Sequence, residues 1–213
     1  MPGETLPLDA AWSAARDALL RGLTHALSNR VMAITTLAEL AAESPASDTT
    51  NDVLSSEARR LDALLHQFRL LSPAPPAPAE PLSIADTLPA LVELAGRHPE
   101  VAGMPCDLRV AANVQPAYID AGMLGRVVPP LVVAATRAAR RTGASRVQID
   151  VSGDAHWVVV RLAVGDAGSA GGPADAASHG SPAMQITDTG QGARYDLLLP
   201  TLAAARRRDR SSS

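Results

Sequence analysis

The chain has 213 residues, 46% of them hydrophobic, with a formal net charge of −3 and an isoelectric point near 5.9. This length and composition suffice for a buried core in one or two domains, and the acidic balance argues against a nucleic-acid or anionic-membrane surface. The single cysteine, Cys106, excludes an internal disulfide and is expected to be a buried thiol. No segment approaches the roughly 20 apolar residues of a membrane span, and the first residues lack a signal-peptide pattern, so we expect a cytoplasmic protein.

A long amphipathic helix is predicted from about Asp9 to the residues before Pro45. Its apolar residues recur at steps of three, four or seven, which is typical of one buried face. They are Trp12, Leu19, Leu23, Leu27, Ile34, Leu37 and Ala41. His25 lies off this face and Asn29 follows one turn later, so both side chains are expected to project into solvent.

A second helix is predicted from the capping residues at 47–50 to the proline-rich segment SPAPPAPAEP at 72–81, which is typical of a semi-rigid linker. Its apolar stripe consists of Val53, Leu54, Leu61, Leu64, Leu65, Phe68 and Leu71. A helical hairpin cannot enclose a core alone, so two copies are expected to pair into a four-helix bundle. The linker predicts two domains, a hairpin over residues 1–72 and a second domain over residues 82–205.

Beyond the linker the pattern changes to mixed α and β. A helix near 82–97, a strand through 106–114 and a helix at about 121–142 are predicted. Strands follow in 146–153 and 156–166, and residues 184–200 are expected to form two strands joined at 189–192. The order favours an α+β chain, a helical hairpin followed by an α/β sandwich with a mainly antiparallel sheet.

This order of elements resembles the cytoplasmic core of bacterial sensor histidine kinases over nearly the whole chain. The stretch HALSNR, which begins at His25, resembles the family's H-box, in which a histidine on the first helix accepts a phosphoryl group. VVPPLVVAATRAARRTGASRVQIDV is similar to the N-box helix and the strand after it. GARYDLLLP resembles the closing strand of the ATP-binding domain. The resemblance implies a dimerisation and phosphoacceptor hairpin followed by an ATP-binding fold.

The departures from the family pattern all concern nucleotide chemistry. Ala26 follows His25 where the family has the acid that activates the imidazole for attack on ATP. Pro130 and Ala134 occupy the positions of the N-box asparagines, and an alanine cannot coordinate the Mg²⁺ that the second amide holds. The adenine-site motif survives only as DAGSA at 166–170, and too few residues follow it for a glycine-rich lid. The resemblance is therefore closest to ChpT-type histidine phosphotransferases, with a degenerate ATP-binding domain and no cofactor.

The expected function is phosphoryl transfer through His25 between receiver-domain aspartates of a bacterial phosphorelay, without ATP. The receiver domain would supply the aspartate and its Mg²⁺. The resemblance implies that Asn29 orients the reacting groups, while Arg21 and Arg30 lie at helical offsets suited to acidic receiver residues or phosphate oxygens. The expected partners are response regulator receiver domains, an upstream hybrid kinase and a second copy of the chain.

Two alternatives stay open. The first is an ATP-dependent histidine kinase with unusual motifs, which nucleotide binding would decide. The second is a scaffold that binds receivers without carrying phosphate, which replacement of His25 would decide. The remaining histidines, His66, His98, His156 and His179, are expected in solvent or fold roles, and the arginine-rich segment at 206–210 is expected to be a solvated tail.

Overall fold

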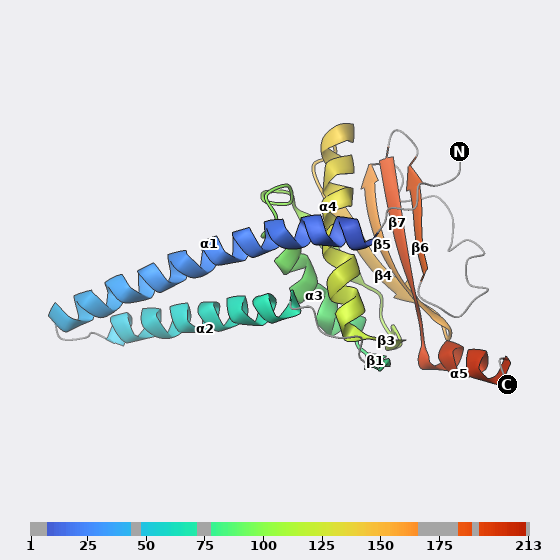
Figure 1. Cartoon of the computed structure of the whole chain (residues 1–213), viewed down its shortest axis with the longest axis horizontal. Helices are drawn as coiled ribbons and strands as arrows, with labels where there is room; N and C mark the ends of the chain where they lie inside the picture. The colour runs from blue at the N-terminus through green and yellow to red at the C-terminus, as the bar shows by residue number, and fades with distance from the viewer. Residues whose placement is uncertain (1–7, 44–47, 72–77, 166–182, 189–191, 212–213) are drawn as a thin grey trace.

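The computed structural model describes residues 8–43, 48–71, 78–165, 183–188 and 192–211. Helices α1 (Leu8–Glu43) and α2 (Asp48–Leu70) form the expected hairpin, which projects away from the rest of the chain (Figure 1). Helices α3 (Ile84–Ala95), α4 (Ala121–Thr142) and α5 (Leu202–Ser211) follow. None of the described helices is both long enough and apolar enough to cross a membrane.

Within the described residues, seven strands form two sheets. They are β1 (Glu80–Leu82), β2 (Cys106–Val110), β3 (Ala117–Ile119), β4 (Val147–Gly153), β5 (Trp157–Gly165), β6 (Ala183–Asp188) and β7 (Gly192–Pro200). The larger sheet has the order β2-β4-β5-β7-β6, in which only the β2–β4 pair is parallel. Strands β1 and β3 make a small antiparallel pair. The predicted α+β class and the hairpin-then-sandwich order are confirmed.

The strand predicted over 106–114 was wrong in its length, because it ends at Val110. Strands β1 and β3 were not predicted, since strands of three residues are too short to show a period of two. The arginine-rich segment belongs to helix α5, in which Ala204 is buried while Arg206 and Arg207 are exposed, as expected of a solvated segment. The Thr201 hydroxyl donates to the Ala155 carbonyl oxygen at 2.8 Å and accepts from the Ala204 backbone N–H, so it anchors and caps this helix.

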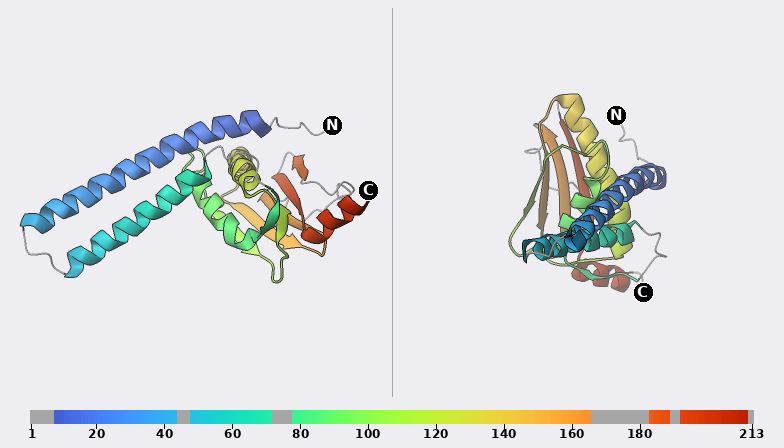
Figure 2. Two further views of the ribbon diagram at one scale, coloured as in Figure 1. Left: turned by 60° about the horizontal axis from the view of Figure 1, so that its bottom comes forward. Right: turned by 90° about the vertical axis from the view of Figure 1, so that its left-hand side faces the viewer.

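Helices α3 and α4 cover one face of the larger sheet (Figures 1 and 2). The Asp120 side chain caps α4 by accepting from the Gly122 backbone N–H at 2.9 Å, and Gly143 ends α4 with a φ of +74°. The base of the hairpin shares its core with these helices, because one apolar cluster contains Leu19 and Leu64 together with residues of α3, α4 and the sheet. The division into two domains at the linker stays a prediction, since residues 72–77 lie outside the described part.

The other face of the sheet carries a buried charge cluster. Asp196 on β7 lies directly opposite Arg161 on β5, and the Arg161 Nε donates to its carboxylate at 2.9 Å. The Arg194 Nε donates to the other carboxylate oxygen at 2.7 Å. Asp196 is only 3% exposed, so the two guanidinium groups supply the hydrogen bonds that a buried carboxylate requires.

The hairpin meets α3 at a backbone contact that leaves no room for a side chain. A Cβ atom at Gly22 on α1 would overlap the carbonyl oxygen of Arg97, which lies just beyond the end of α3. Gly22 is one turn before His25 on the same helix. Glycine at this position therefore sets how closely the segment around Arg97 approaches the helix that carries His25.

We predict that Gly22→Ala destabilises the protein. Alanine normally stabilises a helix interior by about 0.5 to 1 kcal/mol relative to glycine, but overpacking costs about 1 to 3 kcal/mol. The free energy of unfolding should therefore fall by about 1 kcal/mol in chemical denaturation. Ser28→Ala, at an exposed position of the same helix, is the control and should change it by less than about 0.5 kcal/mol. An increase in stability on Gly22→Ala would contradict this account of the contact.

Candidate functional site

His25 is exposed on α1, as the helical periodicity predicted. Its Nε2 lies 3.3 Å from the amide nitrogen of Asn29, one turn further along the helix. An amide N–H can donate only to an unprotonated ring nitrogen, so in this arrangement the proton of the neutral imidazole resides on Nδ1. The contact therefore occupies the single Nε2 lone pair, and it must open before that nitrogen can act as a nucleophile.

His25 and Asn29 border a cleft of about 640 Å³ between α1, α2 and the end of α3, here called the His25 cleft. Its lining residues are Gly22, His25, Ala26, Asn29, Arg30, Arg60, Ala63, Leu64, Glu93 and Arg97. Segments more than 60 residues apart in the sequence thus form one concave surface beside the histidine.

Two arginines of the cleft share one buried carboxylate. Arg30 on α1 and Arg60 on α2 contact the two carboxylate oxygens of Glu57 at 2.9 and 2.5 Å. The hydrogen bond from Arg30 lowers the pKa of Glu57, which is only 6% exposed, so the carboxylate stays ionised. Arg30, predicted to bind a partner, lies in the His25 cleft but already has this intramolecular contact.

The third arginine of the cleft is held more loosely. The Arg97 Nε lies 3.4 Å from the Gln67 side-chain oxygen, and its Nη2 lies 3.4 Å from a carboxylate oxygen of Glu93. The arginines Arg30, Arg60 and Arg97 carry three positive charges, whereas the carboxylates of Glu57 and Glu93 carry two negative charges. This group of side chains therefore has one excess positive charge. The cleft therefore favours an anion beside His25.

The sequence alone did not indicate Arg60, Glu93 or Arg97. Arg60 follows another arginine on a polar helix face, and the other two lie near the end of a different helix. No local spacing connects these positions to His25, so no sequence signal would have found them.

Arg21 lies in a different cleft from His25. This second cleft, of about 350 Å³, is formed by α1, the loop after α3, and α4, and it also contains Pro130 and Ala134. Pro130 is buried, and neither residue has a side-chain oxygen or nitrogen. The Ala134 backbone carbonyl accepts a hydrogen bond from the Tyr195 hydroxyl at 3.3 Å. Pro130 and Ala134 thus line a cleft against α1 and offer no side-chain metal ligand there.

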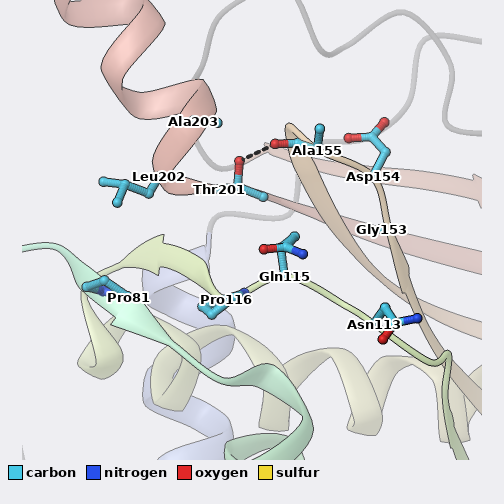
Figure 3. A pocket seen from close by; sticks show the side chains of 10 residues that line it. All are labelled: Pro81, Asn113, Gln115, Pro116, Gly153, Asp154, Ala155, Thr201, Leu202 and Ala203. Atoms are coloured by element: carbon cyan, nitrogen blue, oxygen red, sulfur yellow. Dashed lines mark hydrogen bonds between the residues drawn. The ribbon is translucent and has the colours of Figure 1, made fainter.

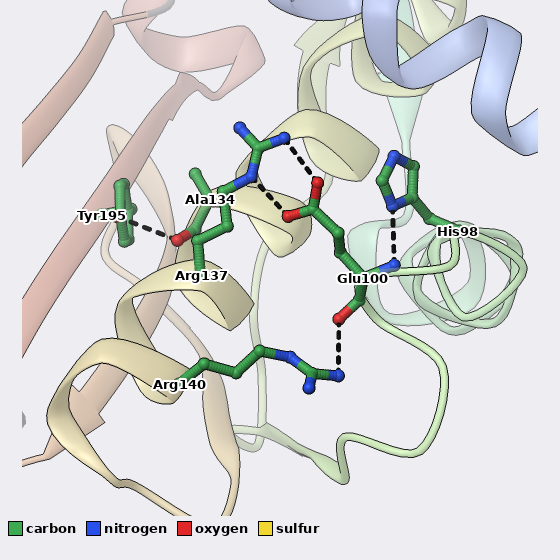
Figure 4. Close-up of polar contacts among 6 residues, drawn as sticks. All are labelled: His98, Glu100, Ala134, Arg137, Arg140 and Tyr195. Carbon is green, nitrogen blue, oxygen red and sulfur yellow. Dashed lines mark hydrogen bonds and ion pairs between the residues drawn. The ribbon is translucent and has the colours of Figure 1, made fainter.

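An ion pair and a buried histidine line this second cleft, and Figure 4 shows their polar contacts. Arg137 makes a two-point contact with Glu100 at 2.5 and 2.7 Å, and Arg140 donates to the Glu100 backbone carbonyl at 3.1 Å. His98 is 5% exposed, and its Nδ1 accepts from the Glu100 backbone N–H at 3.2 Å. Burial lowers the pKa of His98, so its neutral form is favoured. The predicted fold role of His98 is consistent with this packing.

A third cleft, of about 530 Å³, lies near the start of α5 (Figure 3). Its carboxylate, Asp154, already accepts from the backbone N–H groups of His156 and Trp157. No group of three or more histidine, cysteine or acidic side chains suited to a metal ion occurs among the described residues. Of these three clefts, only the His25 cleft is bordered by an exposed histidine.

The remaining sequence predictions have mixed outcomes. His66 is exposed, as expected, and His156 is half-buried. Cys106 is half-buried rather than fully buried, because it lies on the edge strand β2, and burial raises the pKa of its thiol. The DAGSA motif, the predicted loss of the lid and His179 lie outside the described residues.

The sequence matches no protein-family model and no curated protein. Among solved structures, the chain is similar to the Acinetobacter baumannii histidine kinase AdeS, with a TM-score of 0.44 and 14% identity. The match covers 86% of this chain and 97% of that chain.

We predict that His98 makes the stability of the protein depend on pH just below neutrality. The unfolded chain binds a proton at His98 near its ordinary pKa of about 6.5, whereas the folded protein does so only at lower pH. The free energy of unfolding should therefore fall as the pH drops from 6.5 toward the depressed pKa. Chemical denaturation at pH values from 7.5 to about 5 measures this loss of stability. Over this range, carboxyl groups with ordinary pKa values near 4 stay largely ionised.

His98→Asn removes the titrating group and keeps a hydrogen-bond acceptor near the position of Nδ1. It should flatten this pH dependence, whereas His66→Asn, at an exposed position, should leave it unchanged. An identical pH dependence in His98→Asn and the unmodified protein would show that His98 is not the responsible group.

Proposed function

We propose that this protein is a histidine phosphotransferase of a bacterial two-component phosphorelay, in which His25 carries a phosphoryl group between receiver-domain aspartates without using ATP. The observation that supports this most is the exposed His25 imidazole, whose Nε2 contacts Asn29 beside a cleft with excess positive charge. A carrier of this kind needs an accessible nucleophilic nitrogen on a rigid element. The resemblance to histidine kinases, with an H-box at HALSNR, supports the same reading.

The transfer step uses few groups of this chain. The Nε2 lone pair of His25 attacks the phosphorus atom of the receiver's aspartyl phosphate, the N–P bond forms, the P–O bond breaks, and the aspartate carboxylate leaves. The Asn29 amide first releases Nε2, which carries no proton in the tautomer that this contact favours, so no base is needed to deprotonate Nε2 before the attack. The receiver partner would supply the Mg²⁺ that neutralises charge on the phosphoryl oxygens.

We predict that His25→Gln abolishes phosphoryl transfer while leaving the fold intact. The His25 side chain is exposed, so its replacement should change the free energy of unfolding by no more than about 0.5 kcal/mol. Glutamine is polar but cannot form the phosphoramidate bond. The measurement is transfer of radiolabel from purified phosphorylated receiver domains, followed by a test for base-stable, acid-labile label.

Asn29→Ala is a second variant, for which we expect a smaller effect on transfer. The Asn29 contact favours the reactive tautomer but must open before the attack, so Asn29→Ala should leave transfer nearly unchanged or slow it by no more than about fivefold. Full transfer by His25→Gln, or label on His66, would contradict the proposal. Receiver binding without any label on the unmodified protein would favour the scaffold alternative.

We predict that the protein does not bind Mg·ATP with a dissociation constant of about 10 µM or tighter. Such binding corresponds to roughly 7 kcal/mol. Neither Pro130 nor Ala134 offers a side-chain amide for the metal ion, and their face of α4 lies against α1. Calorimetry with ATP and Mg²⁺, with an ATP-binding histidine kinase run in parallel, is the test. Tight binding would instead support the ATP-dependent kinase.

We also propose that two copies pair through residues 9–71 into a four-helix bundle. Several large apolar side chains on the hairpin are exposed, each with 40% to 65% of its surface accessible to solvent. They are Val31, Met32 and Leu40 on α1, and Val53, Leu65 and Phe68 on α2. Each Leu or Phe that a second hairpin buries would contribute roughly 1.5 to 3 kcal/mol.

Light scattering at micromolar concentration should therefore give twice the chain mass of 22.0 kDa. The double variant Leu65→Glu and Phe68→Glu should shift the protein to a monomer, because charged side chains would be buried in the bundle. Arg59→Glu, at an exposed polar position of α2, is the matched control and should stay dimeric. A monomeric unmodified protein would contradict the proposal.

A further inference from the structure

Arg97 is the one arginine of the His25 cleft that the α3 region contributes rather than the hairpin. The Gly22 contact places its backbone against α1 one turn before His25. Its side chain is about one-third exposed and lines the same cleft as His25 and Asn29. The backbone of Arg97 therefore packs against α1, while its side chain is partly exposed and lines the cleft.

The contacts of Arg97 are weak enough to exchange. Both of its side-chain contacts, to Gln67 and to Glu93, are 3.4 Å long, beyond the 2.7 to 2.9 Å of a strong charge-assisted hydrogen bond. Arg30 and Arg60, in contrast, contact Glu57 at 2.9 and 2.5 Å. An incoming phosphoryl group would displace a long contact at Arg97 more easily than a short one at the other two arginines.

We infer that Arg97 binds the phosphoryl group at His25, so that the α/β part of the chain completes the transfer site of the hairpin. The inference rests on the proposed function and assigns a role to a residue outside the phosphoacceptor hairpin. The guanidinium group presents a planar pair of N–H donors to two phosphoryl oxygens, and Glu93 holds it in place until the anion arrives. Glu93 therefore competes with the phosphoryl group for Arg97 and takes no part in the transfer itself.

The test uses phosphoramidate as the phosphodonor, because it needs no identified receiver. The Nε2–P bond forms as the P–N bond of phosphoramidate breaks, and ammonia leaves. The rate of His25 labelling is followed by intact mass, and the site is assigned by comparison with His25→Gln. Arg97→Gln should slow labelling by about tenfold, which is the loss of one charge-assisted contact, and Arg97→Lys should restore part of the rate.

Two further variants separate phosphoryl binding from a structural role. Glu93→Gln removes the competing carboxylate and should raise the labelling rate by at least about twofold, a change that lost packing would not produce. Arg59→Gln is the matched control, because Arg59 is an exposed arginine of α2 outside the cleft, and it should label at the unmodified rate. Added salt should slow the unmodified protein more than Arg97→Gln.

The outcomes distinguish this inference from the proposed function. If the unmodified protein labels at His25 and Arg97→Gln labels at the same rate as Arg59→Gln, the role of Arg97 is wrong and the phosphocarrier stands. If Glu93→Gln slows labelling as much as Arg97→Gln does, the pair is structural and the inference is also wrong. If the unmodified protein takes no label at His25, the proposed function itself fails.

Discussion

Helix α1 passes the end of α3 at Gly22, and the backbone carbonyl of Arg97 occupies the space where any other residue would place its Cβ atom. This contact connects the two parts of the chain at the turn that precedes His25. An α-helix is stiff over one turn, so the relative position of Gly22 and His25 is fixed by helix geometry. The location of the α3 end relative to the histidine therefore follows from one glycine, together with the shared apolar cluster beneath it.

The same contact separates two surfaces of α1 that differ in character. On the side of His25, the helix borders a cleft with three arginines and one excess positive charge. On the side of Arg21, it lies against α4, whose facing positions Pro130 and Ala134 have no polar side-chain atoms. In the proposed function these surfaces correspond to a retained phosphoryl-transfer site and a lost nucleotide site. In the same proposal, the α/β part of the chain has a role without nucleotide, because it positions a charged side chain beside the histidine.

Buried charge in this protein is consistently placed where guanidinium groups can satisfy it. Glu57 lies between Arg30 and Arg60 in the hairpin, and Asp196 lies between Arg161 and Arg194 in the sheet. In both cases one carboxylate is shared by two arginines. In the hairpin the resulting excess positive charge lies at the edge of the His25 cleft, where it contributes to the site.

The sequence by itself determined the two long helices, the α+β class and the exposed position of His25, because helical periodicity is a local property of neighbouring residues. It also identified Ala26, Pro130 and Ala134 as positions without the expected polar side chains, since side-chain chemistry needs no coordinates. It did not reveal β1, β3 or α5 as such, because the strands are too short for a period and α5 depends on the Thr201 contacts. Only the tertiary structure brought Arg60, Glu93 and Arg97 to the cleft of His25 and showed that Arg21 lines a second cleft. The position of Arg60 depends on how α2 packs against α1, and the positions of Glu93 and Arg97 depend on how the end of α3 meets α1. Contacts between residues this far apart in the chain leave no mark in local sequence spacing.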